Sequence, residues 1–196
     1  MREGVLWYSV RNRRRKADEI VLFMRSRGCR SLLLCGSVPE SVGNSRNEGV
    51  VERAIADEAE EVLGFDIVAR AAQPWPAVVA DGRCMPFADD SYDVVVSNAV
   101  IEHVGDESDQ QRFVAEHTRV GRHWVITTPN RWFPVESHTS AVLRHWSPRW
   151  SRRRTEFTRL LSKREFTALL PQGAVVVGRP WSPTFTAFYA KHASPE

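Results

Sequence analysis

The sequence lacks an apolar stretch long enough to cross a membrane. No uninterrupted run approaches the ~20 apolar residues that a spanning helix needs, and residues 1–16 do not have the plan of a signal peptide. Cysteine is scarce: the chain has three, Cys29, Cys35 and Cys84, and their spacing fits no metal site. These absences predict free thiols, no bound metal and a cytoplasmic location.

Signatures of several nucleotide-dependent enzyme classes are also missing. Residues 36–43 do not form the G-x-G-x-x-G turn of dinucleotide-binding enzymes, and no Tyr-x-x-x-Lys sequence occurs, which disfavours a nicotinamide oxidoreductase. No Asn/Asp-Pro-Pro-Phe/Tyr sequence and no nucleic-acid-binding module occurs either. Nucleic acid is therefore not an expected partner, although the basic charge alone would permit one.

The composition is that of one folded domain. The 196 residues are 42% apolar and 26% charged, which suits a single core and predicts one domain over residues 1–196. The net charge of +3 is unevenly distributed, with five basic residues in 11–16 and four in 149–154. Such clusters suit an anionic or phosphorylated small molecule, an anionic membrane surface or a carrier protein; the alternative is a solvated surface.

The most informative segment runs from Ala80 to Val104 and reads ADGRCMPFADDSYDVVVSNAVIEHV. It contains three consecutive valines, 94–96, with turn-forming residues on both sides, which predict a strand buried on both faces. Such strands belong to parallel sheets covered by helices. Polar residues gather where this strand ends, as expected of a ligand site in an open α/β sheet.

Two motifs resemble those of class I S-adenosylmethionine (SAM)-dependent methyltransferases. The first comprises Asp81, Pro86-Phe87, Asp90, Tyr92-Asp93, Val95 and Ile101-Glu102-His103, and the second is the run TPNRWFPVESH from Thr128 to His138. The resemblance implies a Rossmann-like, doubly wound α/β fold. Its seven-stranded sheet would be mostly parallel and would end in an antiparallel C-terminal hairpin. It also implies S-adenosyl-L-methionine as the cofactor.

The expected elements follow from this resemblance and from the apolar periodicity. Helices are predicted over 12–27, 48–60 and 110–119 and within 158–170, where Ser162 and Glu165 would form a capping box. Strands are predicted over 31–35, 62–67, 75–80, 94–96, 123–128, 174–177 and 184–189. Residues 141–165, rich in arginine and tryptophan, are expected as an insertion that caps the pocket or meets a lipid headgroup or an acidic carrier.

The resemblance assigns the cofactor to residues at the ends of four strands. It gives the ribose to Asp66 and the adenine amino group to Asp81. The other implied neighbours of the cofactor are Gly36, Ser37, Gly82, Arg83 and Asn98. The first turn departs from the family pattern, because Leu34 and Val38 stand where an acid and a glycine are usual.

Several alternatives to these assignments stay open. Residues 36–43 could form a plain turn, Asp66 could cap a helix, and 81–82 could be an ordinary Asp-Gly turn. Met85 and Phe87 could pack on the adenine ring or fill the core.

His103, Glu136 and His138 are the candidate catalytic residues. Histidine is the side chain best suited to accept a proton near neutral pH, although a packing role stays open for both histidines. The expected function is methyl transfer from SAM to a small-molecule, lipid-linked or carrier-linked acceptor, with a hydroxyl as the acceptor group. The alternative is a protein of this fold that binds SAM or a nucleotide for other chemistry, or serves as a binding subunit.

Overall fold

The computed structural model of the chain describes residues 2–36, 49–68, 74–134 and 158–191. One seven-stranded sheet has the order β3-β2-β1-β4-β5-β7-β6. Its strands are β1 (Ser31–Cys35), β2 (Glu61–Asp66), β3 (Ala77–Val79), β4 (Tyr92–Asn98), β5 (Gly121–Pro129), β6 (Val175–Val177) and β7 (Thr184–Ala190). Strands β1 to β5 pair in parallel, whereas β7 runs antiparallel to β5 and β6. The predicted fold class is confirmed.

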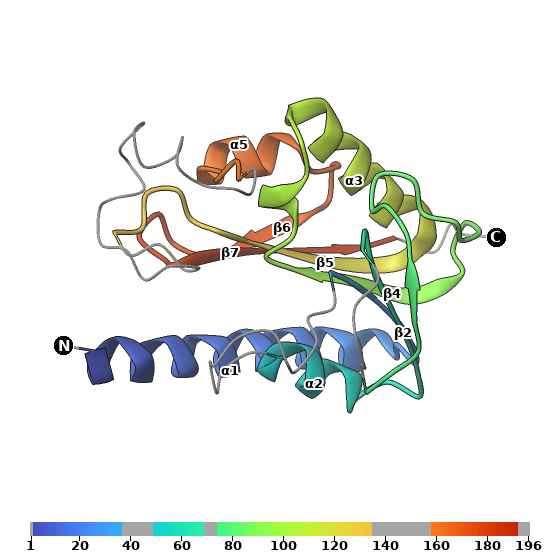
Figure 1. Cartoon of the computed structure of the whole chain (residues 1–196), viewed down its shortest axis with the longest axis horizontal. Helices are drawn as coiled ribbons and strands as arrows, with labels where there is room; N and C mark the ends of the chain where they lie inside the picture. The colour runs from blue at the N-terminus through green and yellow to red at the C-terminus, as the bar shows by residue number, and fades with distance from the viewer. Residues whose placement is uncertain (1, 37–48, 69–73, 135–157, 192–196) are drawn as a thin grey trace.

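Helices cover both faces of this sheet (Figure 1). The long helix α1 (Arg2–Arg27) and α2 (Val50–Ala56) lie on one face, and α3 (Glu107–Val120) and α5 (Lys163–Ala168) lie on the other. A 3-10 turn, η1 (Ile101–His103), follows β4. Among the described residues, no helix combines the length and the apolar character that crossing a bilayer requires.

The central strands alternate their side chains between two apolar clusters. Leu33, Val95 and Trp124 belong to the cluster shared with α3 and α5, and their neighbours at 32, 94 and 125 belong to the cluster shared with α1 and α2. All six side chains are fully buried. The valine run of β4 is therefore buried on both faces, as its sequence predicts.

Two predicted helices differ in extent from the observed ones. Helix α1 begins at Arg2, ten residues before its apolar stripe suggests, and residues 2–11 contain no proline that would stop it. Helix α2 ends at Ala56, because the chain turns back and the Glu60 amide donates to the carbonyl of residue 30 at 2.8 Å. The capping box of α5, between Ser162 and Glu165, is confirmed.

The order of the strands creates a topological switch point at the carboxyl edge of the sheet. The chain moves outward from β1 through β2 to β3, then returns to place β4 on the other side of β1. Connections therefore leave β1 and β4 in opposite directions, and this switch point is where open α/β sheets bind ligands.

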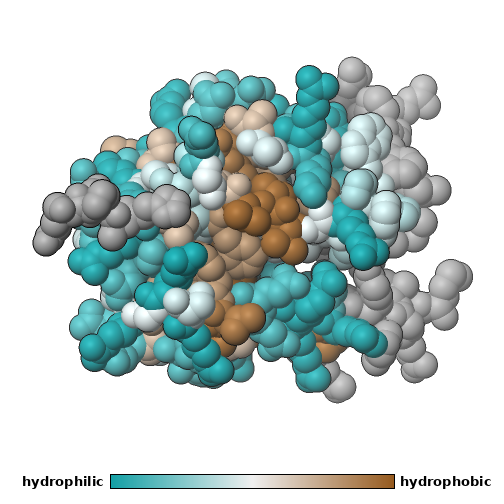
Figure 2. All heavy atoms as spheres, turned by 180° about the vertical axis from the view of Figure 1, so that it is seen from behind, coloured by the Kyte–Doolittle hydropathy of each residue, from teal (hydrophilic) through white to brown (hydrophobic). Residues whose placement is uncertain are grey.

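An apolar patch faces solvent on the side of the molecule turned away in Figure 1. Figure 2 shows it surrounded by polar side chains.

The edge strand β6 contributes exposed valines, Val175 and Val177, to the molecular surface. A free strand edge of only three residues is too short to pair extensively with another chain.

Candidate active site

Four predicted cofactor residues lie together at the carboxyl edge of the sheet. Gly36 follows β1, Asp66 ends β2, Asp81 comes two residues after β3, and Asn98 ends β4. The Gly36 amide donates to the carbonyl of Phe65 at 2.9 Å, and the Ala80 amide donates to the carbonyl of Asp66 at 3.0 Å. Hydrogen bonds between neighbouring segments thus hold the ends of β1, β2 and β3 side by side.

The carboxylates of Asp66 and Asp81 share one neighbour, the buried thiol of Cys35. Burial raises the pKa of this thiol well above its ordinary value, and the negative charges of Asp66 and Asp81 raise it further. The two carboxylates therefore lie on the same side of the molecule, near the end of β1. A thiol with a raised pKa is a poor nucleophile, so Cys35 acts here as a core side chain.

Asp81 is held by Arg83, which stands two residues further along the chain. Its carboxylate accepts from the Arg83 amide at 2.9 Å, from Nε at 3.0 Å and from Nη2 at 2.7 Å. These bonds lower the pKa of Asp81. Arg83 also pairs with Asp109 of α3 at 3.1 Å. Arg83 Nε also contacts the second carboxylate oxygen of Asp81 at 3.1 Å. The three donors of Arg83 thus make four contacts with Asp81, the number of acceptor positions that a carboxylate offers, so a ligand has to share or replace one of them.

Two predicted glycines lie where a side chain would not fit. A Cβ atom at Gly36, whose φ is +70°, would lie 2.4 Å from Val100 Cγ2. A Cβ atom at Gly82 would lie 2.6 Å from the Phe113 ring and 3.5 Å from Cys35 Sγ. The backbone at both positions is therefore in close contact with its neighbours. Ser37, the other residue predicted in the first turn, lies outside the described residues.

Asn98 is the centre of a polar cluster that joins four elements. Its Oδ1 accepts from Lys16 Nζ at 2.5 Å and from Thr127 Oγ1 at 2.8 Å, and its Nδ2 donates to Glu52 Oε1 at 2.7 Å. Burial lowers the pKa of Lys16 to about 8, against the opposing effect of Glu52. Ala99, which follows Asn98, adopts a left-handed φ of 58°, an uncommon conformation for alanine that often accompanies functional sites.

Lys16 and Glu52 are residues that the sequence analysis did not single out. Lys16 directly precedes the apolar stripe of α1, and its side chain is as buried as that stripe. A lysine at the border of an apolar helix face is usually solvated, because its charged end can reach water. The sequence shows only that Lys16 borders the apolar stripe. That position does not distinguish a buried lysine from an exposed one.

His103 lies on η1, next to the fully buried Glu102. Its Nδ1 is 3.4 Å from Thr158 Oγ1, on the segment that precedes α5. The carboxylate of Glu102 accepts from Thr128 Oγ1 at 3.3 Å, and its carbonyl accepts from the Arg159 amide at 2.7 Å. The Glu-His pair thus connects β4, β5 and the segment before α5. The other predicted catalytic residues, Glu136 and His138, and residues 141–157 of the predicted cap lie outside the described residues.

The start of the second motif connects β5 to the turn between β6 and β7. Asn130 is buried, and its Nδ2 donates to the carbonyls of Pro180 and Ser182 at 2.7 and 2.8 Å. Its Oδ1 accepts from the Trp132 amide at 2.9 Å. The turn over residues 178–183 is therefore fixed beside the carboxyl end of β5.

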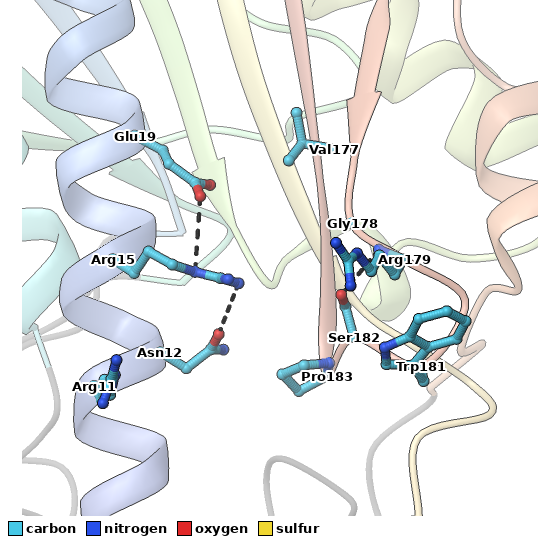
Figure 3. Close-up of a pocket in the computed structure, with 10 residues that line it drawn as sticks. All are labelled: Arg11, Asn12, Arg15, Glu19, Val177, Gly178, Arg179, Trp181, Ser182 and Pro183. Carbon is cyan, nitrogen blue, oxygen red and sulfur yellow. Dashed lines mark hydrogen bonds and ion pairs between the residues drawn. The ribbon is translucent and has the colours of Figure 1, made fainter.

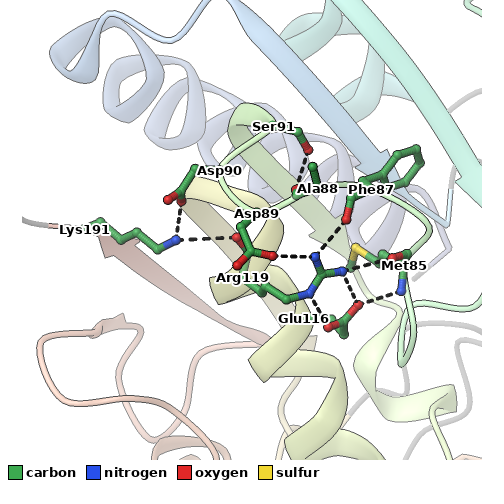
Figure 4. Close-up of polar contacts among 9 residues, drawn as sticks. All are labelled: Met85, Phe87, Ala88, Asp89, Asp90, Ser91, Glu116, Arg119 and Lys191. Carbon is green, nitrogen blue, oxygen red and sulfur yellow. Dashed lines mark hydrogen bonds and ion pairs between the residues drawn. The ribbon is translucent and has the colours of Figure 1, made fainter.

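Arg119 of α3 organises the loop that follows Asp81 (Figure 4). It donates to Glu116, to Asp89 and to the carbonyls of residues 85 and 87 at 2.7 to 2.9 Å. Met85 is buried in the core, and Phe87 packs at its border against Phe65 and Tyr92. Of the two alternatives for these side chains, core filling is the one observed.

Comparisons with known proteins agree with this geometry. A family model described as "Methyltransferase domain" matches residues 43–123. That range includes Asp66, Asp81 to Arg83, Asn98 and His103, and it begins after the divergent turn at Gly36. A probable S-adenosylmethionine-dependent methyltransferase of Mycolicibacterium smegmatis is 39% identical over 94 residues, which are 43% of this chain and 35% of the relative. The chain thus spans about a third of the length of this curated relative.

Solved structures show the same architecture at low sequence identity. An S-adenosylmethionine-dependent methyltransferase from Mesorhizobium loti superposes with a TM-score of 0.52 at 17% identity, over 82% of this chain and 90% of that one. A 1,6-didemethyltoxoflavin-N1-methyltransferase from Burkholderia thailandensis, solved with S-adenosylhomocysteine, gives a TM-score of 0.53 at 15% identity, over 97% and 84% of the two chains. The names of these three proteins mention S-adenosylmethionine or S-adenosylhomocysteine. Residues 43–123 are therefore similar to a methyltransferase domain, and the chain has the α/β fold of these solved methyltransferases, as its motifs predict.

Proposed function

We propose that the chain is a SAM-dependent methyltransferase that holds its cofactor at the carboxyl edge of the sheet. The observation that carries this proposal is the placement of Asp66 and Asp81 on neighbouring segments, with the Cys35 thiol near both carboxylates. In this arrangement Asp66 accepts the ribose hydroxyls, and Asp81 accepts from the adenine amino group by sharing or replacing one of its contacts with Arg83.

The surrounding residues suit an adenosine group. The close-packed glycines Gly36 and Gly82 leave backbone groups without side chains that would cover them. Arg83 fixes the orientation of the Asp81 carboxylate and contributes its backbone next to the base. Asn98 acts as a positioning residue, since its amide is already bonded to Lys16, Glu52 and Thr127.

When bound, the cofactor supplies an activated methyl group on sulfur. The chain then has to bind the acceptor, align it, exclude water and take up the proton that the acceptor loses. We propose a hydroxyl as the acceptor group, on a small molecule or on a lipid- or carrier-linked one. His103, Glu136 and His138 are the groups proposed to receive that proton.

Titration calorimetry with S-adenosylhomocysteine tests the cofactor site. Asp66→Ala and Asp81→Ala should each weaken binding by roughly tenfold or more, because each removes a charge-assisted hydrogen bond. Asp18→Ala, at an exposed position of α1, is the matched control and should leave the affinity unchanged. Unchanged affinity in both site variants would refute the proposal.

One observation favours a second function for the same pocket. The family match begins at residue 43, and the turn before it lacks the acid and the second glycine of the family pattern. A protein that uses the adenosine pocket for non-methyl chemistry, or as a binding subunit, would tolerate this divergence. Mass spectrometry of the ligand that co-purifies distinguishes the two: SAM or S-adenosylhomocysteine supports methyl transfer, and a nucleotide supports the alternative.

A further inference from the structure

A cavity of about 570 Å³ lies between α1 and the turn that joins β6 to β7. Figure 3 shows its two walls, with Arg11, Asn12, Arg15 and Glu19 on the helix and residues 177–179 and 181–183 opposite them. A volume of this size suits a small organic molecule. Of the described residues that the sequence predicts to bind the cofactor, none lines it.

Positive charge predominates in this cavity. Of the described residues that line it, three carry a guanidinium group, Arg11, Arg15 and Arg179, and one carries a carboxylate, Glu19. Arg15 interacts with Glu19 at 3.7 Å and donates to Asn12 Oδ1 at 3.2 Å. Of the described residues, none supplies a carboxylate partner to Arg179. Arg15 and Arg179 therefore have donors available for a ligand, and guanidinium groups are the usual means of binding a carboxylate or a phosphate.

The wall formed by the β6–β7 turn also offers a flat apolar surface. Trp181 is 68% exposed, and the Arg179 guanidinium lies over its ring at 5.9 Å. An exposed indole beside a cation can stack on a planar apolar group whose acidic substituent reaches the arginine. This combination favours a ligand with one planar apolar part and one anionic part.

The turn that carries Arg179 and Trp181 is held in place by its surroundings. The Arg179 amide donates to Ser182 Oγ at 2.9 Å, and Lys163 Nζ donates to the Gly178 carbonyl at 2.7 Å. Asn130 fixes the same turn to the end of β5. A wall ordered in this way binds a ligand at a lower entropic cost than a mobile loop would.

The cavity is next to the cofactor edge of the sheet. Arg15 directly precedes Lys16, whose Nζ reaches Asn98 at the end of β4. On the opposite wall, the Pro183 carbonyl accepts from the Asn130 amide at 2.9 Å, directly after β5. One wall is therefore bonded to the carboxyl end of β4 and the other to the carboxyl end of β5.

We propose that this cavity binds the methyl acceptor, and that the acceptor is a small planar apolar molecule with a carboxylate or phosphate group. Arg15 and Arg179 hold the anionic group, and Trp181 stacks on the apolar part. The identification of this ligand as the methyl acceptor rests on the proposed function. Binding of the anion, in contrast, can be measured without any cofactor.

Calorimetry with three related probes tests this proposal. Naphthyl phosphate and naphthoate carry the two anions, and naphthol is their neutral counterpart. Wild-type protein should bind at least one of the two anions about tenfold more tightly than naphthol, and the tighter of the two identifies the acidic group. Arg15→Gln and Arg179→Gln should each weaken that anion by about tenfold and leave naphthol unchanged. Trp181→Ala should weaken all three probes.

Arg164→Gln, at an exposed position of α5, is the matched control and should bind like the wild type. Equal anion affinity in Arg179→Gln and Arg164→Gln, equal affinity of the wild type for naphthol and both anions, or no binding at all would overturn the proposal. Thermal melting verifies that each variant is folded. S-adenosylhomocysteine is titrated into the same samples. If the wild type does not bind it, the proposed function is refuted. The probe titrations test the cavity independently of that result.

Discussion

Lys16 of α1 donates a hydrogen bond to Asn98 Oδ1 at the end of β4, across 82 positions of sequence. The lysine lies in a buried environment that lowers its pKa to about 8. Asn98 also bonds to Glu52 and Thr127, so that one amide connects two helices and two strands at the switch point. The long first helix is therefore attached to the sheet at its switch point.

Asn98→Ala should lower the free energy of unfolding by about 3 kcal/mol, because it leaves Lys16 and Glu52 buried without this partner. Urea denaturation at neutral pH measures the loss. Asn12→Ala removes an exposed hydrogen bond from α1, the helix that carries Lys16. It should change stability by no more than ~0.5 kcal/mol. Similar losses in both variants would show that the cluster contributes little.

Gly36→Ala should destabilise the protein more than Gly28→Ala does. Both glycines have left-handed φ angles, +70° and +62°, but only a Cβ at Gly36 meets another atom, Val100 Cγ2. The backbone strain of about 1 kcal/mol is common to both, and the contact adds roughly 1–3 kcal/mol at Gly36. Thermal denaturation provides the comparison, and Val100→Ala in the Gly36→Ala background should recover part of the difference.

His117 should make stability depend on pH between about 4 and 6.5. It is fully buried, and burial lowers its pKa from 6.5 to about 4. The unfolded chain therefore takes up a proton first as the pH falls, so stability is complete above pH 6.5 and declines until about pH 4. The contribution of this residue amounts to about 3 kcal/mol. His117→Gln should show a flatter profile in urea titrations, and identical slopes would contradict the assignment.

Arg119→Met should cost about 2 kcal/mol of stability, since it removes the hydrogen bonds that hold residues 85–89 to α3. Arg122→Met is a suitable comparison, because Arg122 is more exposed and makes an ion pair with Asp93 at 3.1 Å. An exposed pair of this kind contributes about 0–1 kcal/mol. Chemical denaturation of both variants measures the difference, which should vanish if the loop is held by its apolar contacts alone.

The sequence predicts the sheet better than the helices. The valine run of β4 and the leucines of β1 have no polar side chain to expose, so they specify central strands without knowledge of their neighbours. The start of α1 could not be placed, because its first turns lie outside the apolar stripe that defines the packed part of the helix. Helix ends depend on caps and tertiary contacts that periodicity does not encode.

The candidate site is only partly readable from sequence for a similar reason. Asp66 and Asp81 can be found because they follow strands, and parallel strands end at one edge. Lys16 and Arg179 belong to segments far apart in the chain, and only the packing of α1 against the sheet brings their surroundings together. Asp81 and Arg83 are close in sequence, but the rotamers of their side chains depend on Asp109 of α3. These rotamers determine which oxygen positions of Asp81 a ligand can reach.

Helix α1 divides into two parts with different constraints. From Lys16 to Met24, one side is buried in the core, so substitutions there are opposed by the cost of disturbing close packing. At Arg11, Asn12 and Arg15, the side chains border the cavity and leave the core untouched. Natural variation or directed evolution can therefore alter which molecules this protein accepts by changing one turn of helix, with almost no penalty to folding.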